Sequence, residues 1–342
     1  MDWGHVPRTR ELPADPAQAR AAIRAAGDAP AVFRGLVAHW PAAQAGAQSD
    51  AAALAYLRAL APHASREVEI FVSPPGGRGW IGFTPDLAGV NFHKRRETLL
   101  SLLGRLEAHA PDADPPVIYA GAIPLRETLP AFLAENRNPL AQEPEPQLVS
   151  LWLGAGCRVP AHWDVPQNLI CVVSGRRRYI LFPPEQVANL YSGPLDRTLA
   201  GQPSSLVDFD APDFARHPRF AEAVAAAQVA ELGPGDALYL PSMWWHQASS
   251  FGPIGAMMNI WWREGPQPLA SPLSTLVHGL STLRDLPAAE RAAWHAFFAF
   301  YLFEDPQAAT AHLPESALGV HGPRSEAQLR RIADIVARSL LR

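Results

Sequence analysis

The stretch VPAHWDVPQN, residues 159–168, contains the feature on which the interpretation of this chain depends. It places His162 and Asp164 two residues apart, and on an extended segment two such side chains point to the same face. A third candidate of the same kind, His246, lies in the strand-like run 245–249. Because imidazole and carboxylate groups are common metal ligands, the three residues form a candidate metal site.

The surroundings favour a metal site over the alternative, an ordinary surface pair. A His-x-Asp tripeptide is weak evidence on its own, because it also occurs in turns and on surfaces. Here Pro160 and Ala161 lead into it from an apolar strand, and GPGDALYLP (residues 233–241) predicts a turn and a buried strand before His246. Burying two histidines and a carboxylate would be costly without a partner. Two histidines and one carboxylate are also the facial triad that binds iron(II) in non-haem oxygenases.

Short apolar runs around the candidate site predict a β-barrel or sandwich, because they are separated by turns rich in Gly and Pro. The expected strands are 148–153, 168–173, 177–182, 228–232, 237–240, 245–249 and 255–262. Helices are expected at 16–25, 50–60, 98–109, 127–134, 269–286, 288–303 and 325–341, with further strands at 31–34, 67–72 and 117–120. The fold is therefore predicted to be mainly β with helical additions. Residues 1–146 would pack on the core, 147–265 would form the barrel, and 266–342 would be C-terminal helices.

Composition restricts the class of protein further. Hydrophobic residues make up 48% of the chain and charged residues 18%, which predicts a packed core. The net charge of −4 gives no general attraction to nucleic acid or to an anionic membrane, and the basic run 93–96 is interpreted as a solvated loop. No run approaches the ~20 apolar residues of a membrane span, and residues 1–13 lack the apolar segment of a signal peptide. Cys157 and Cys171 are expected to be buried thiols, which is typical of a cytoplasmic protein.

Three stretches together resemble the JmjC, cupin-like hydroxylases. They are VPAHWDVPQN (159–168), GRRRYILFPP (175–184) and the segment from PGD (234–236) to WWH (244–246), and they occur in the same order in that family. Within the family the motifs are most similar to those of the asparaginyl hydroxylase that inhibits the hypoxia-inducible factor. The specific motifs cover about residues 119–262. The resemblance implies a double-stranded β-helix, or jelly-roll, as the barrel.

The same resemblance implies Fe(II), O2 and 2-oxoglutarate as co-substrate, with His162, Asp164 and His246 as the iron ligands. Family members bind the far carboxylate of 2-oxoglutarate with a lysine, whereas this chain has Arg177 at the matching position. A guanidinium can bind a carboxylate through two hydrogen bonds, and the alternative is that Arg177 is a surface strand residue.

Further polar residues match co-substrate positions of the family. Tyr119 corresponds to the tyrosine that binds the same carboxylate, and Asn168 and Asn259 correspond to polar residues near the co-substrate and the iron. Asn in an apolar strand is costly unless it is hydrogen-bonded, which favours a site role. Val159 stands where relatives often have threonine, so one hydrogen bond to the co-substrate is expected to be missing.

These features predict a 2-oxoglutarate-dependent dioxygenase that hydroxylates an unactivated C–H bond, with a protein side chain as the first choice of substrate. A small molecule or a modified RNA base stays possible as substrate, although nucleic acid is not the expected partner. Two other classes remain open: a cupin metalloenzyme of another type, such as an isomerase or a co-substrate-independent dioxygenase, and a non-catalytic cupin that binds a ligand or partner. The C-terminal helices, apolar at Leu269, Leu276, Leu280 and Leu283, predict either packing on the barrel or a homodimer.

Overall fold

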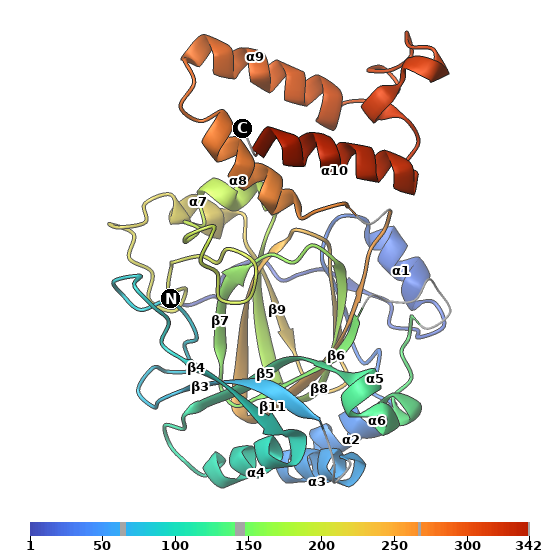
Figure 1. Cartoon of the computed structure of the whole chain (residues 1–342). Coiled ribbons are helices and arrows are strands. Elements are labelled where there is room, and N and C mark those ends of the chain that lie inside the picture. Colours follow the sequence, from blue (N-terminus) through green and yellow to red (C-terminus); the bar gives the residue numbers. More distant parts are fainter. Residues whose placement is uncertain (62–65, 141–147, 266–267, 341–342) are drawn as a thin grey trace. The chain divides into compact units, whose positions relative to one another are not determined.

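A computed structural model describes residues 1–61, 66–140, 148–265 and 268–340. They form two compact units, Met1–Glu264 and Gly265–Arg342. The predicted boundary between residues 146 and 147 lies outside the described residues. The first unit contains a β-barrel with helices packed around it (Figure 1).

The strands are β1 (Glu11–Leu12), β2 (Ala31–Phe33), β3 (Glu67–Ser73), β4 (His93–Thr98), β5 (Val117–Pro124), β6 (Leu148–Gly154), β7 (Arg158–His162), β8 (Gln167–Phe182), β9 (Gln228–Leu232), β10 (Ala237–Leu240) and β11 (Trp245–Trp262). The helices of the first unit are α1 (Ala19–Ala26), α2 (Pro41–Gln48), α3 (Asp50–Leu60), α4 (Leu99–His109), α5 (Leu125–Thr128), α6 (Pro130–Glu135), the 3-10 turn Pro184–Ala188 and α7 (Phe220–Ala225). The prediction of a mainly β fold with helical additions is confirmed.

Two long strands, β8 and β11, join two sheets into the barrel. The two halves of each of these strands pair with different neighbours. The larger sheet has the order β1-β2-β10-β8-β11-β6-β5-β3-β4. At the other ends of the two long strands, β9 pairs with β8 and β7 pairs with β11. Gly175 allows β8 to turn, because its φ is +74° and a Cβ there would lie 2.5 Å from the carbonyl oxygen of Ile254. The expected strands 168–173 and 177–182 are thus the two halves of one strand.

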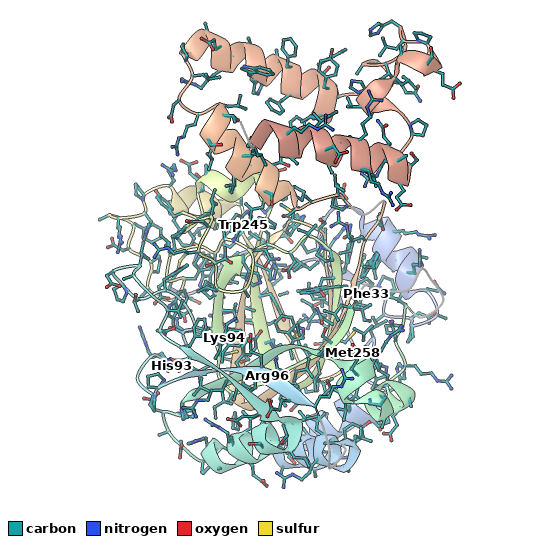
Figure 2. All side chains as sticks on the ribbon, viewed as in Figure 1. Phe33, His93, Lys94, Arg96, Trp245 and Met258 are labelled. Carbon is teal, nitrogen blue, oxygen red and sulfur yellow. The ribbon has the colours of Figure 1, made fainter. Side chains whose placement is uncertain are left out.

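Apolar side chains fill both faces of the larger sheet. On the outer face, Phe33 and Met258, labelled in Figure 2, pack with residues of α1, α2, α3 and α4. On the inner face, side chains such as Val172, Tyr179 and Met257 fill the barrel. The alternation of inward and outward residues along each strand therefore separates the helix-covered core from the barrel interior.

The basic run 93–96 differs from its prediction. His93, Lys94 and Arg96, labelled in Figure 2, belong to strand β4 and not to a loop. β4 pairs along its length with β3, and Lys94 forms an ion pair with Glu69 at 3.2 Å. Its side chains are mostly exposed, because β4 is the last strand of the larger sheet.

The second unit is helical. It contains α8 (Pro272–Thr282), α9 (Ala288–Phe298), the π-helical turn Ala299–Phe303, the 3-10 turns Glu315–Ala317 and Gly319–His321, and α10 (Glu326–Leu340). Large apolar side chains of this unit are exposed, among them Phe297, Leu302 and Phe303. Among the described residues of the chain, no helix combines the length and the apolar character that crossing a lipid bilayer requires.

Candidate metal centre

Strands β7 and β11 bring the two candidate histidines together. His162, the last residue of β7, stands directly opposite His246 in the antiparallel ladder, and their ring centroids are 4.3 Å apart. Asp164 follows β7 by two residues, and its backbone carbonyl accepts a hydrogen bond from the N–H of Met243 at 2.8 Å. One ligand atom from each of His162, Asp164 and His246 lies within 4.8 Å of the others. The sequence therefore identified three residues that the fold does bring together.

Backbone carbonyls orient both imidazoles. Nδ1 of His162 donates to the carbonyl oxygen of Pro160 at 2.9 Å, and Nδ1 of His246 donates to that of Trp244 at 3.0 Å. A carbonyl oxygen can only accept, so each Nδ1 carries the proton and each Nε2 is left with its lone pair. Nε2 of His246 lies 3.6 Å from a carboxylate oxygen of Asp164. In metal sites, hydrogen bonds from one ring nitrogen to a backbone carbonyl hold histidine ligands in position.

Electrostatics favour a neutral His246. Burial, with the nearby His162, lowers the pKa of His246 to about 4, although Asp164 opposes the shift. The imidazole is therefore unprotonated at neutral pH and can act as a ligand. Asp164 and His246 are buried, whereas His162 is partly exposed, so solvent reaches the cluster at His162.

The donor set fits iron(II). Two imidazole nitrogens and one carboxylate oxygen form a facial triad, which leaves coordination positions free for other molecules. In the part of the chain that the structure describes, no further His, Cys, Asp or Glu belongs to this cluster.

Arg177 on β8 lies inside the barrel and is 4% exposed. Its Nε has no hydrogen-bond partner among the described residues, and its guanidinium hydrogen-bonds the Tyr179 hydroxyl. The guanidinium of Arg177 also lies beside Gly255: a terminal nitrogen is 3.6 Å from the position that a Cβ would have on that glycine. The neighbouring Arg176 is exposed, in contrast to Arg177. A buried cation with an unpaired N–H is costly, and an anion in the barrel would remove that cost.

Tyr119 on β5 faces the same region. Burial raises the pKa of its hydroxyl well above the ordinary value, and the positive charge of Arg177 opposes this shift. Asp164 also acts electrostatically on Tyr119, so the tyrosine lies within electrostatic range of both Arg177 and the candidate metal site. The Tyr119 ring packs against Phe71 and Trp152 at centroid distances of 5.9 and 6.0 Å.

The two candidate asparagines are buried, and each has one unpaired atom. Oδ1 of Asn259 accepts a hydrogen bond from Nε1 of Trp152 at 2.8 Å, while its Nδ2 has no partner in the described part of the chain. Oδ1 of Asn168 likewise lacks a described partner, as do Ser150 Oγ and Trp261 Nε1. Asn168 and Trp261 are opposite each other in the β8–β11 ladder. Unpaired buried polar atoms are rare in folded proteins, and water, an ion or a bound polar molecule can supply their missing partner.

Sequence reasoning did not assign two residues of this region. Tyr179 contacts Arg177, and its hydroxyl donates to the sulfur of Met257 at 3.2 Å. Trp152 holds the side chain of Asn259. The role of Tyr179 could have been found in the sequence, because its period-two spacing from Arg177 places both on one face of the strand. The Trp152–Asn259 contact could not, because it depends on the pairing of β6 with β11.

Comparison with known proteins identifies the family. Residues 17–267 match the sequence pattern of the cupin-like domain. The human bifunctional peptidase and (3S)-lysyl hydroxylase JMJD7 is 30% identical over 262 residues, which cover 68% of this chain and 77% of that protein. The chain therefore belongs to the JmjC and cupin-like family, and the jelly-roll core with helical additions is confirmed.

Two other relatives share shorter stretches. The tRNA wybutosine-synthesizing protein 5 of Danio rerio is 31% identical over 144 residues, 42% of this chain and 41% of that protein. The lysine-specific demethylase JMJ31 of Arabidopsis thaliana is 32% identical over 117 residues, 34% of this chain and 21% of that protein. The matched region thus spans less than half the length of either of these relatives.

Proposed function

We propose that this protein is an Fe(II)- and 2-oxoglutarate-dependent oxygenase that hydroxylates an unactivated C–H bond. The observation that carries the proposal is the pairing of a three-residue ligand cluster with a buried, incompletely paired arginine in the same barrel. A metal satisfies the first feature, and a small dicarboxylate that reaches from the metal to the arginine satisfies the second.

Each residue has a distinct role in this proposal. His162, Asp164 and His246 would bind the metal, and Arg177 with Tyr119 would bind the far carboxylate of 2-oxoglutarate. Bound iron with this co-substrate supplies the oxidising power of dioxygen, while 2-oxoglutarate is converted to succinate and carbon dioxide.

The protein supplies orientation and exclusion of water. Carbonyl oxygens of Pro160 and Trp244 accept from both Nδ1 atoms, which would leave both Nε2 atoms free to bind the metal. The unpaired Nδ2 of Asn259 and Oδ1 of Asn168 offer a donor and an acceptor to the bound molecules. Val159 has no hydroxyl to add a hydrogen bond to the co-substrate, so Arg177 and Tyr119 would carry most of its recognition.

A protein side chain is the substrate class that we propose. The lysyl hydroxylase named in the longest of these matches acts, by its name, on a protein residue, and the net charge of −4 gives this chain no general attraction to RNA. The wybutosine relative makes a tRNA base the alternative. The motif likeness to the asparaginyl hydroxylase of the hypoxia-inducible factor stays a prediction, and we transfer no substrate from it.

Turnover tests the function. The purified chain is incubated with Fe(II), 2-oxoglutarate and dioxygen in the presence of peptide pools, and succinate is measured. We expect succinate release that the His162→Ala variant lacks and that Arg176→Ala, an exposed neighbour of the anchor, retains. A protein that binds one metal per chain but releases no succinate with peptides, metabolites or tRNA would instead support the non-catalytic binding role.

A cytoplasmic homodimer is part of the same proposal. The second unit exposes Phe297, Leu302 and Phe303 by 57%, 59% and 80% of their surface, and large exposed apolar side chains are the kind that a protein interface buries. Light scattering in solution measures the mass. Twice the chain mass of 37.1 kDa supports the dimer, and the single chain mass contradicts it.

A further inference from the structure

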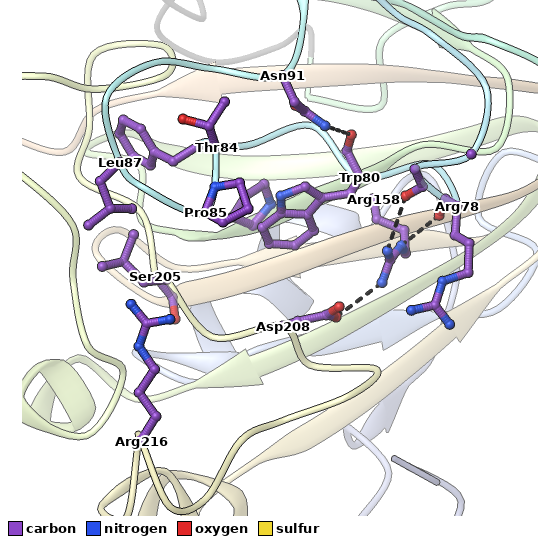
Figure 3. A pocket seen from close by; sticks show the side chains of 15 residues that line it. Arg78, Trp80, Thr84, Pro85, Leu87, Asn91, Arg158, Ser205, Asp208 and Arg216 are labelled. Carbon is purple, nitrogen blue, oxygen red and sulfur yellow. Dashed lines mark hydrogen bonds and ion pairs between the residues drawn. The ribbon is translucent and has the colours of Figure 1, made fainter.

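A pocket of about 400 Å³ lies in the first unit, where none of the candidate metal or co-substrate residues lines it. Two loops form most of its wall: residues 76–91, between β3 and β4, and residues 205–216, which precede α7. Arg158 and Pro160 of β7 complete it (Figure 3). Its volume is in the range of sites that hold a small ligand or a few residues of a peptide.

The charge of one pocket arginine, Arg158, is already compensated by carboxylates of the protein. Arg158 donates to Asp208 at 3.1 Å and to Asp210 at 2.6 Å, and its Nε donates to the carbonyl of Arg78 at 2.8 Å. Arg178 binds the other oxygen of Asp210 at 3.0 Å. Two guanidinium groups and two carboxylates therefore compensate one another and hold the two loops against β7.

Two further arginines, Arg78 and Arg216, line the pocket with uncompensated charge. Both are exposed, and neither guanidinium has a hydrogen-bond or ion-pair partner among the described residues. Figure 3 shows Arg216 extending toward Ser205 and Arg78 beside Arg158. Since Asp208 is occupied by Arg158, the pocket presents a net positive charge to a ligand.

Apolar side chains form much of the rest of the wall, beside the polar side chains of Thr84, Asn91 and Ser205. Trp80, Phe83, Pro85 and Leu87 come from the first loop. One face of the Trp80 indole is covered by Arg158, whose guanidinium carbon lies 5.6 Å from the ring centroid. A nucleobase needs an open aromatic face, whereas an aliphatic side chain needs only apolar contact. The combination thus favours a carboxylate next to an apolar group over a nucleotide.

Pro160 connects this pocket with the candidate metal centre. Its ring lines the pocket, and its carbonyl oxygen accepts the hydrogen bond from Nδ1 of His162. The two residues are two positions apart in β7, which is about 6.6 Å along an extended strand. A segment held in the pocket would therefore lie near His162, the partly exposed residue of the metal cluster.

We propose that this pocket binds an acidic segment of a protein substrate, with Arg78 and Arg216 contacting its carboxylates and Trp80 and Leu87 contacting a neighbouring apolar side chain. The inference rests on the proposed function only in naming the bound protein a substrate. Binding itself needs no iron, co-substrate or oxygen, so it can be tested when turnover fails.

The test uses the full chain without metal, immobilised and panned against a library of random linear peptides. We expect enrichment of peptides with Asp or Glu beside an apolar residue. A synthetic copy of an enriched peptide should bind about tenfold more weakly to the Arg78→Ala/Arg216→Ala variant, since exposed ion pairs are individually weak. The same loss is expected when the acidic residues of the peptide are replaced by their amides.

Arg137→Ala is the matched control, because Arg137 is exposed, has no described side-chain partner and follows α6 away from the pocket loops (Figure 1). It should bind like the unchanged chain. Absence of acidic enrichment, or enrichment that persists in the double variant, would overturn the proposal. The proposal would also be overturned if adenosine monophosphate bound to the unchanged chain but not to the double variant. The pocket would then be a nucleotide site. Unchanged metal content of the double variant shows that the barrel is intact.

Discussion

Replacing Arg177 by methionine should weaken the binding of 2-oxoglutarate without lowering the stability of the ligand-free protein. Methionine keeps an unbranched side chain but removes the charge and every donor. Removing one partner of a buried, hydrogen-bonded charge pair costs about 2–5 kcal/mol of binding free energy. At about 1.4 kcal/mol per tenfold change, the dissociation constant of 2-oxoglutarate should rise by roughly thirtyfold to a few thousandfold.

The same substitution should not weaken the protein without its ligands. Arg177 is 4% exposed and its Nε is unpaired, so the ligand-free barrel bears the desolvation cost of the charge. Replacing a buried ion pair with apolar residues is often neutral or stabilising by about 1–4 kcal/mol, and Arg177 has no carboxylate partner among the described residues whose charge its removal would leave unpaired. The urea midpoint of the metal-free variant is therefore expected to equal or exceed that of the unchanged chain.

Calorimetry with the iron(II) protein under anaerobic conditions measures the affinity, and Arg176→Met is the control. Arg176 is the exposed neighbour on the same strand, so its substitution should leave the affinity unchanged. An affinity for 2-oxoglutarate within about threefold of the original in Arg177→Met would refute the assignment of the anchor. Arg177→Lys, which restores the lysine of the family, should retain binding.

Three further substitutions test the metal site and the barrel. Asp164→Ala should abolish stoichiometric metal binding, measured as metal content after dialysis, because two histidines alone no longer form a facial triad; full occupancy would contradict the ligand assignment. Trp152→Phe removes the donor to the buried Asn259 and should lower the free energy of unfolding by about 1–3 kcal/mol, measured by urea denaturation; an unchanged urea midpoint would count against that hydrogen bond. Gly175→Ala should cost at least about 2 kcal/mol by the same assay, because its φ is +74° and a Cβ would meet the carbonyl of Ile254; a stable variant would show that β8 does not turn there.

Much of the element pattern could be predicted from local sequence. Helix α3 begins and ends where the spacing of Leu54, Leu57 and Leu60 indicates, and Ser49 caps it by accepting from the N–H of Ala52. Strands β9 and β10 also have their expected bounds. In these segments propensity and burial point to the same structure.

Other elements depend on contacts that local sequence does not encode. The charged run of β4 lacks an apolar alternation, and it is a strand because β3 offers it hydrogen bonds at the sheet edge. Gly175 indicates a break between two strands, yet both halves of β8 stay paired with β11. Helix α2 is not among the expected helices, although it begins at Pro41, a residue suited to the first helical turn.

The candidate site likewise contains some residues that local sequence predicts and others that only the tertiary fold brings together. His162 and Asp164 could be predicted together because an i, i+2 spacing in a strand suffices. The inward direction of Arg177 followed from the same periodicity only after a barrel was assumed. The pocket of Arg78 and Arg216 could not be predicted, since its two loops meet only through tertiary packing.

Anaerobic titration of the metal-free chain with Fe(II) and then 2-oxoglutarate tests the central claim most directly. We expect one iron per chain and a visible charge-transfer absorption that appears only when both are present. His246→Ala should lose the iron and the absorption, whereas Arg177→Met should keep the iron and need far more 2-oxoglutarate. Iron binding that survives loss of His246, or an absorption that never appears with 2-oxoglutarate, would contradict the claim.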